Sequence, residues 1–229
     1  VAESRARVEQ RADDPNGVLR LRPIWRGQAP APAPWSMGHP LSLRLGLPDL
    51  HLFPHDDWRR LAGRARRRLD RTSGGYGDAR GSEALRKAIA GHVSVTRAVA
   101  CGPGDIVVTH GAQQAFDLIA KVLVEPGRTV VALEEPGYPP MRHAFAQAGA
   151  VLAPVAVDAD GLIAEAIPPD AAIVCVTPSH QFPLGAPMSR ARRQARLGVA
   201  DRADAVIVED DYVGEFRFET RSLDALQPL

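Results

Sequence analysis

The sequence predicts an α/β fold with a mainly parallel sheet and helices on both faces. Short runs rich in Val, Ile and Ala alternate with helical patterns of about ten residues or more, as in parallel strands joined by crossover helices. The chain of 229 residues is also 45% hydrophobic and is long enough to bury a sizeable core. In such a sheet, ligands bind at the carboxyl ends of the strands.

Strands are expected where β-branched and small apolar residues run together. The expected strands are residues 106–109, 129–133, 151–155, 172–176 and 205–208. The spacing of apolar residues predicts a helix before or after most of these strands. These helices are residues 113–124, 140–148 and 189–203.

Two further helices are expected before the first strand. Asp56 or Asp57 can cap a helix that runs to about Asp70. Its apolar stripe is Trp58, Leu61, Ala65 and Leu69. Ser82 can cap the next helix. The stripe of that helix is Leu85, Ala88, Ile89 and Val93.

Residues 1–35 have the composition of a linker, and residues 36–229 have that of a folded domain. The linker contains Pro30-Ala31-Pro32-Ala33-Pro34, and alternating proline favours an extended, semi-rigid backbone. A linker that opens a chain suggests that another segment precedes it.

The composition argues against several classes of protein. The net charge of +1 gives no global reason to bind nucleic acid or an anionic membrane. Cys101 and Cys175 are too few for a disulfide scaffold. No run approaches the roughly 18 apolar residues of a membrane span, so we expect a cytoplasmic protein without a membrane segment. Only Lys87 and Lys121 are lysines, which limits the amine chemistry available to the chain.

Small residues follow the first expected strand and lead into a helix. Gly111, Ala112 and Gln113 stand at this helix N-terminus, where backbone N–H groups and the helix dipole favour an anion such as a phosphate. The alternative is an ordinary strand-to-helix turn in which glycine supplies backbone freedom. Neither a G-x-G-x-x-G nor a G-x-x-x-x-G-K-[ST] motif is present, which disfavours dinucleotide and P-loop nucleotide binding.

Aromatic or polar loops follow two of the next strands. The turn 134–139 presents the ring of Tyr138, which can stack on a flat heteroaromatic ligand or close the edge of the core. The loop 177–185 carries His180 and Gln181 between two prolines. Its polarity suits either ligand contacts or a solvated loop.

Three acids, Glu209, Asp210 and Asp211, follow the last expected strand and precede Tyr212. A carboxylate there can pair with a protonated ring nitrogen, hold a metal or lie in a solvated turn. No nearby histidine or further carboxylate completes a metal-ligand set, so no metal site is expected. Together, the strand-end segments suit a phosphorylated, cationic heteroaromatic cofactor.

These motifs, in this order, resemble the fold-type I pyridoxal-phosphate enzymes of the aminotransferase class I/II family. The likeness runs from about residue 43 to the C-terminus. It is strongest to the aminotransferase-like domain of MocR/GabR-type bacterial regulators, where a linker joins a GntR-type winged helix to that domain. The motifs that carry the likeness are Leu47-Pro48-Asp49, Phe53-Pro54, Tyr76-Gly77-Asp78, Gly111-Ala112-Gln113-Gln114, Glu135-Pro136-Gly137-Tyr138, residues 177–183 and Glu209-Asp210-Asp211-Tyr212.

The resemblance implies pyridoxal 5'-phosphate as the cofactor. By that resemblance, Gly111, Ala112 and Gln113 would hold its phosphate, and Tyr138 would stack on its ring.

The resemblance also implies contacts at the other edge of the ring. Asp210 would pair with the pyridine nitrogen and keep it protonated, and Tyr212 would hydrogen-bond the phenolic oxygen. Phe182 stands where many aminotransferases have an asparagine. His180 or Gln181 would therefore take over the contact that this asparagine makes.

The sequence departs from the family pattern at a lysine. The family attaches the cofactor as a Schiff base to a lysine beyond the last motif seen here, and neither Lys87 nor Lys121 occupies that place. The arginine that binds a substrate carboxylate and the winged helix are also absent. We therefore expect a fragment that does not catalyse transamination as written.

The leading hypothesis is the pyridoxal-phosphate-binding effector domain of a MocR-type transcriptional regulator. Its full-length parent would be a homodimer that senses pyridoxal phosphate or a small amino compound and binds DNA through a winged helix outside this chain. The alternative is a fragment of a free-standing amino acid aminotransferase. The basic run 58–71 could contact nucleic acid, but its alternation with apolar residues favours an amphipathic helix with a solvated face.

Overall fold

The computed structural model describes residues 49–69, 74–194, 205–214 and 223–227. The chain divides into two compact units, residues 1–74 and residues 75–229, and each is described by itself. In the first unit, the short helix η2 (Leu50–Leu52) precedes α2 (His55–Leu69). The expected linker, residues 1–35, lies outside the described residues.

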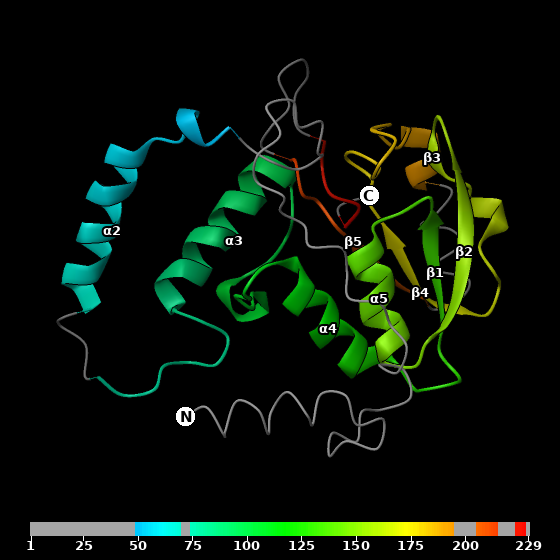
Figure 1. Cartoon of the computed structure of the whole chain (residues 1–229), viewed down its shortest axis with the longest axis horizontal. Coiled ribbons are helices and arrows are strands. Elements are labelled where there is room, and N and C mark those ends of the chain that lie inside the picture. Colours follow the sequence, from blue (N-terminus) through cyan, green and yellow to red (C-terminus); the bar gives the residue numbers. More distant parts are fainter. Residues whose placement is uncertain (1–48, 70–73, 195–204, 215–222, 228–229) are drawn as a thin grey trace, which may run out of the picture. The chain divides into compact units, whose positions relative to one another are not determined.

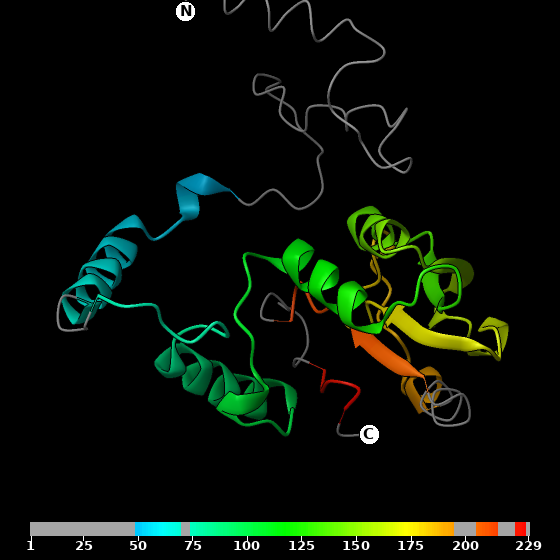
Figure 2. The ribbon, with the colours of Figure 1, turned by 90° about the horizontal axis from the view of Figure 1, so that it is seen from below.

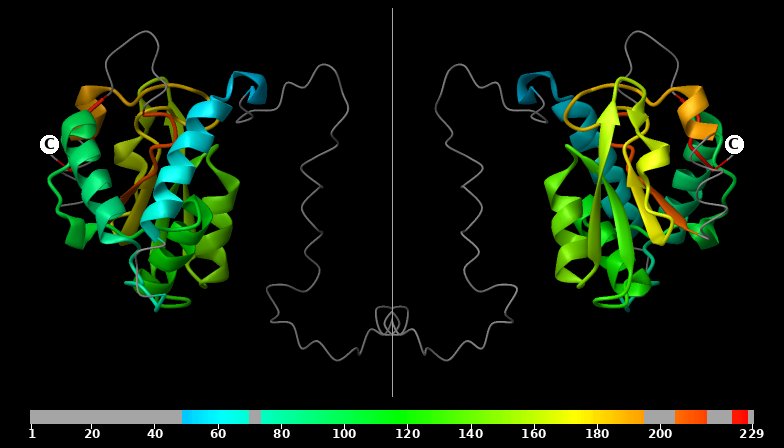
Figure 3. Two further views of the ribbon diagram at one scale, coloured as in Figure 1. Left: turned by 90° about the vertical axis from the view of Figure 1, so that its left-hand side faces the viewer. Right: turned by 90° about the vertical axis from the view of Figure 1, so that its right-hand side faces the viewer.

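The second unit is built on a five-stranded sheet with the strand order β3-β2-β1-β4-β5 (Figure 1). The strands are β1 (Val130–Glu135), β2 (Val151–Asp158), β3 (Gly161–Leu162), β4 (Ala171–Val176) and β5 (Val206–Glu209). β1 is parallel to both β2 and β4, and β4 is parallel to β5. Only the short strand β3 is antiparallel, and it pairs with β2 at the edge of the sheet. Figure 3 shows the strands side by side. The expected mainly parallel sheet is therefore confirmed.

Side chains alternate between two cores because successive strand residues point to opposite faces of the sheet. One face packs against α4 (Ala112–Leu123) and α5 (Pro139–Gln147). The core residues of that face are Phe116, Ala120, Val131, Leu133, Met141, Ala144, Phe145, Ile173, Cys175 and Val208.

The other face has its own apolar cluster. Ala132, Val174 and Val176 point into it from β1 and β4, and η4 (Ala164–Ala166) contributes Ala164. Figure 2 shows α4 and α5 on one side of the strands and the helical residues 190–194 on the other. The α/β fold class is confirmed. Residues 195–203 of the expected helix 189–203 lie outside the described residues.

The expected strand at residues 106–109 is wrong, because the structure places no strand there. A strand requires a neighbour that accepts and donates hydrogen bonds along its length. Among the described residues, Val108 N–H donates to the Arg80 carbonyl at 2.8 Å, and the sheet ends at β3 and β5. The β-branched run therefore lies extended beside a loop.

The expected cap of the first early helix is wrong, whereas that of the second is confirmed in position. α2 begins at His55, so Asp56 and Asp57 lie inside its first turn and form ion pairs with arginines one turn later. Ser82 does occupy the N-cap position of α3 (Glu83–Arg97), but its side chain makes no capping hydrogen bond.

The buried face of α3 also differs from the expected apolar stripe. Leu85 and Ala88 are exposed, whereas Arg86, Ala90 and Arg97 are buried. Buried arginines require acceptors for their charged N–H groups, and both of these find carboxylates and other oxygens outside the helix. Helical spacing of apolar residues cannot predict such partners. Among the described helices, none is long and apolar enough to cross a membrane.

Candidate functional site

Three loops meet at the carboxyl edge of the sheet, because β1, β4 and β5 run in parallel and end there. Their aromatic side chains form a chain of edge-to-face contacts. Tyr138, after β1, contacts Phe182 with a centroid separation of 5.3 Å, and Phe182 contacts Tyr212 at 6.3 Å. His180 lies 5.9 Å from Tyr212. The structure thus brings together Tyr138, His180 and Tyr212, and it adds Phe182 as the ring between them.

A tight turn presents Tyr138 at this edge. Gly137 precedes it, and a Cβ on Gly137 would overlap the carbonyl of Glu134, so only glycine fits. Tyr138 is the N-cap residue of α5, with prolines in the first turn of that helix. Its ring also contacts Phe116 of α4 at 6.3 Å. The turn therefore fixes the aromatic ring against both helices.

The expected phosphate-binding residues lie at the start of α4. Gly111 is the N-cap residue and has a φ of 80°, in the left-handed region that favours glycine. No atom lies within 4 Å of the position that its Cβ would occupy. The next residues, Ala112 and Gln113, open the helix, and N–H groups of a first helical turn have no partner within the helix. This arrangement leaves room for an anion.

Asp210 follows β5 and is half-buried. Its backbone N–H donates to the Val176 carbonyl at 2.8 Å, which extends the pairing of β5 with β4. Burial, together with the negative charge of Glu134, raises the pKa of the Asp210 carboxyl to about 6. Burial and these two carboxyl groups also raise the pKa of Tyr212 to about 12. A cation placed at this edge would offset the electrostatic cost of ionising Asp210.

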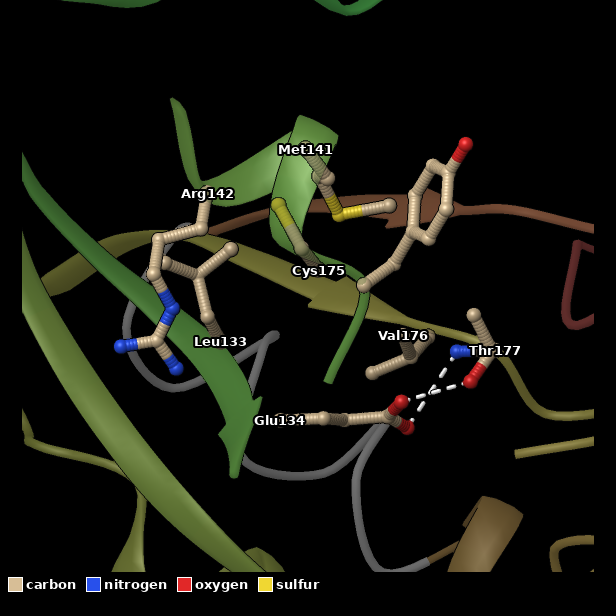
Figure 4. A pocket seen from close by; sticks show the side chains of 8 residues that line it. Leu133, Glu134, Met141, Arg142, Cys175, Val176 and Thr177 are labelled. Atoms are coloured by element: carbon tan, nitrogen blue, oxygen red, sulfur yellow. Dashed lines mark hydrogen bonds between the residues drawn. The ribbon is translucent and has the colours of Figure 1, made fainter. Parts of the chain in front are cut away.

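A buried carboxylate near the end of β1, Glu134, binds the loop that follows β4 (Figure 4). It accepts hydrogen bonds from the Thr177 backbone N–H at 3.2 Å and from the Thr177 hydroxyl at 2.6 Å. The Gln181 amide also donates to it at 3.1 Å. Sequence analysis missed this role because a glutamate at the end of a strand usually indicates a solvated turn.

Gln181 is fully buried, and its amide forms hydrogen bonds with the loop after β1 and with the loop after β4. Nε2 also donates to the carbonyls of Pro136 (2.8 Å) and Phe182 (2.7 Å), while Oε1 accepts the Leu184 N–H (3.1 Å). His180, in contrast, is exposed at the edge. A cofactor contact by either residue stays a prediction, and His180 is the one that is accessible for it.

Neither lysine lies at the strand ends. Lys87 on α3 forms an ion pair with Glu83 at 2.7 Å, and Lys121 on α4 forms one with Asp117 at 2.5 Å. Both side chains are exposed. Lys121 is also about 13 Å along the helix axis from the start of α4, at 1.5 Å per residue.

A protein-family model matches most of this chain. The model of the aminotransferase class I and II family matches residues 46–226. The chain belongs to this family. Its curated relatives include the probable rhizopine catabolism regulatory protein MocR of Rhizobium meliloti, which is 38% identical over 80% of this chain. The pyridoxine biosynthesis transcriptional regulator PdxR of Corynebacterium glutamicum is 32% identical over 82% of the chain.

The chain spans only 37% of that MocR protein and 40% of that PdxR protein. It is therefore homologous to part of the aminotransferase-like domain of MocR-type regulators. Among solved structures, kynurenine aminotransferase of Pyrococcus horikoshii in complex with PMP superposes with a TM-score of 0.72 and 26% identity. That match covers 80% of this chain and 47% of the enzyme. The fold is thus that of fold-type I aminotransferases.

The family assignment and this cofactor-bearing neighbour support pyridoxal phosphate as the cofactor of the domain. The residues at the strand ends fit it chemically. The α4 N-terminus has an open side for a phosphate, the aromatic side chains can flank a flat ring, and Asp210 has a carboxyl group whose ionisation a ring cation would favour.

Proposed function

We propose that this chain forms the cofactor-binding edge of the effector domain of a MocR-type transcriptional regulator. The observation that carries the proposal is the convergence of Tyr138, Asp210 and Tyr212 at one edge of a parallel sheet, beside the open N-terminus of α4. An anion site, aromatic rings and a half-buried carboxyl group match the three chemical parts of pyridoxal phosphate: its phosphate, its ring and its ring nitrogen.

In this proposal, each group of residues has one role. The backbone N–H groups of Gly111, Ala112 and Gln113 hold the phosphate, and the ring of Tyr138 stacks on the cofactor ring. His180 is placed to make a further contact because it is exposed beside Tyr212. Gln181 fixes the loop that carries His180, because its amide donates hydrogen bonds to Glu134 and to the carbonyl of Phe182.

Asp210 and Tyr212 act on the electronics of the ring. Asp210 holds a proton on the pyridine nitrogen, and the Tyr212 hydroxyl donates to the phenolic oxygen. When bound, the cofactor supplies a protonated pyridine ring that serves as an electron sink. Neither Lys87 nor Lys121 is placed to bond the cofactor covalently, so we expect this chain by itself to bind it without transamination.

At the level of the whole protein, we propose a homodimeric cytoplasmic regulator that senses pyridoxal phosphate or a small amino compound. DNA binding would reside in a winged helix outside this chain, joined to the domain at residues 36–229 by the linker 1–35. A free-standing aminotransferase is less supported, because the curated relatives reported above are regulators.

A titration with pyridoxamine phosphate tests the cofactor site. This ligand has the ring, the phosphate and the ring nitrogen, but it cannot react with a surface lysine as an aldehyde does. We expect saturable binding to the 229-residue chain, and weaker binding to the Asp210→Ala variant. The control is Asp117→Ala, which removes a carboxylate from the exposed surface of α4. Absence of saturable binding to the unaltered chain would contradict the proposal.

The assignment to a regulator has its own test. Reading the gene upstream of codon 1 should show a coding region for a winged helix, of about the size of a small domain. An upstream stop codon with a start codon at the domain boundary would instead favour the free-standing aminotransferase.

A further inference from the structure

Arg97, the last residue of α3, is a buried cation that the proposed cofactor contacts do not use. Its side chain is only 7% exposed. One terminal nitrogen donates to the Ser179 hydroxyl and to a carboxylate oxygen of Glu209, both at 3.0 Å. The other terminal nitrogen forms an ion pair with Asp211. A single guanidinium therefore joins α3 to the loops that follow β4 and β5.

The two carboxylates on Arg97 lie on either side of Asp210 in the sequence. Asp210 itself forms no ion pair among the described residues, and burial together with the charge of Glu134 raises the pKa of its carboxyl group. The run of three acids is thus divided. Arg97 of α3 neutralises the carboxylates of Glu209 and Asp211. The carboxyl group of Asp210 can therefore pair with a cation at the carboxyl edge of the sheet.

Further hydrogen bonds fix the backbone around the three acidic residues. The second oxygen of Glu209 accepts the Leu226 N–H at 2.8 Å, and the Arg97 carbonyl accepts the Ala225 N–H at 2.9 Å. The Asp210 N–H is held by Val176 of β4. The backbone on both sides of Asp210 is therefore anchored through groups that do not include its own carboxylate.

We propose that Arg97 is a positioning residue for the cofactor edge, which directs Asp210 toward the ring nitrogen by holding Glu209 and Asp211 away from it. This inference rests on the proposed cofactor site. The planar guanidinium suits the task because it can bind two carboxylates and a hydroxyl in fixed directions, which a lysine ammonium cannot do. Through Ser179, the same group also fixes the residue before His180.

The test compares two ligands that differ at one atom. Pyridoxamine phosphate carries the ring nitrogen, and its analogue with CH in place of that nitrogen cannot pair with Asp210. We expect the unaltered chain to prefer pyridoxamine phosphate by about tenfold or more, the worth of one charge-assisted hydrogen bond. We expect Arg97→Met to lose most of that preference and Arg97→Lys to keep a part of it.

Arg86 provides the matched control. It lies on the same helix, is equally buried, and bonds Asp78 at 2.9 Å and the Gly81 carbonyl at 3.1 Å, neither of which binds Glu209, Asp210 or Asp211. Arg86→Lys and Arg86→Met should lower stability but leave the preference between the two ligands unchanged. If Arg97 had only a structural role, its variants would also lower stability and leave the preference between the two ligands unchanged, as the Arg86 variants do.

The outcomes separate this inference from the proposed function. If the unaltered chain binds neither ligand, the proposed cofactor site is wrong. If it prefers pyridoxamine phosphate and a folded Arg97→Met variant keeps that preference, the role of Arg97 is wrong and the site stands. If Arg97→Met does not fold, the ligand preference is measured on Asp211→Asn instead, because this variant removes the charge of one partner of Arg97. An unchanged ligand preference in Asp211→Asn would then overturn the inference.

Discussion

At the scale of single residues, Asp210 makes stability depend on pH. Its pKa of about 6 lies above the ordinary value of 3.8, so between these values the folded chain binds more protons than the unfolded chain. Its contribution to stability is therefore complete below pH 3.8 and is lost as the pH rises through 6. We expect Asp210→Asn to be the more stable protein at pH 7 by about 2 kcal/mol at most, after discounting for partial exposure.

Urea unfolding at pH 4 and at pH 7 measures this difference. The gain from Asp210→Asn should appear only at the higher pH. An equal gain at both pH values would contradict the role of ionisation.

Gly137 is a second residue whose effect can be predicted. A Cβ there would overlap the Glu134 carbonyl, so Gly137→Ala must displace the turn that presents Tyr138. We expect a loss of about 1–3 kcal/mol in the free energy of unfolding, as for overpacked sites. Gly91→Ala, inside α3 with no atom within 4 Å, should instead stabilise the chain by about 0.5–1 kcal/mol. Thermal unfolding of both variants checks the contrast.

At the scale of elements, the loops after β1 and β4 act as one unit because Gln181 and Glu134 join them. Gln181→Met has a similar volume but removes a buried donor from Glu134 and from two carbonyls. We expect a loss of about 2–3 kcal/mol, since these acceptors stay buried. Gln147→Met, at the end of α5, should change stability by no more than about 0.5 kcal/mol. Denaturant unfolding that shows equal effects would remove the proposed link between the loops.

At the scale of the whole molecule, cofactor binding should stabilise the folded chain, because the strand-end residues are assembled only when the sheet forms. At a concentration of pyridoxamine phosphate 100 times its dissociation constant, the gain should be about 2.7 kcal/mol. The thermal midpoint should rise with ligand concentration. Pyridoxamine without the phosphate should give a smaller shift, and an equal shift would contradict phosphate binding at α4.

Much of the fold could be read from local patterns. The runs that became β1, β2, β4 and β5 are short, β-branched and separated by helical spacing, and each lies within three residues of its expected bounds at both ends. The strand-end motifs could be recognised for the same reason, since a glycine turn, an aromatic residue between two prolines and a run of acids are local features. The expectation of pyridoxal phosphate as the cofactor followed from their order and from the family resemblance.

Other features depend on partners that are far away in the sequence. Residues 106–109 have the composition of a strand, but no described strand lies beside them to complete the pairing. No local pattern marks Arg97, because only folding brings it to Glu209, 112 positions later. Glu134 and Gln181 are 47 positions apart and meet for the same reason.

Local composition was therefore sufficient to predict the strands β1, β2, β4 and β5 and the kinds of side chain that follow them. The burial of charged groups, and the pairing of Glu209 and Asp211 with Arg97, required the folded chain. The physical reason is that periodicity and turn chemistry are properties of adjacent residues, whereas a buried ion pair is stable only when three-dimensional packing supplies all of its partners.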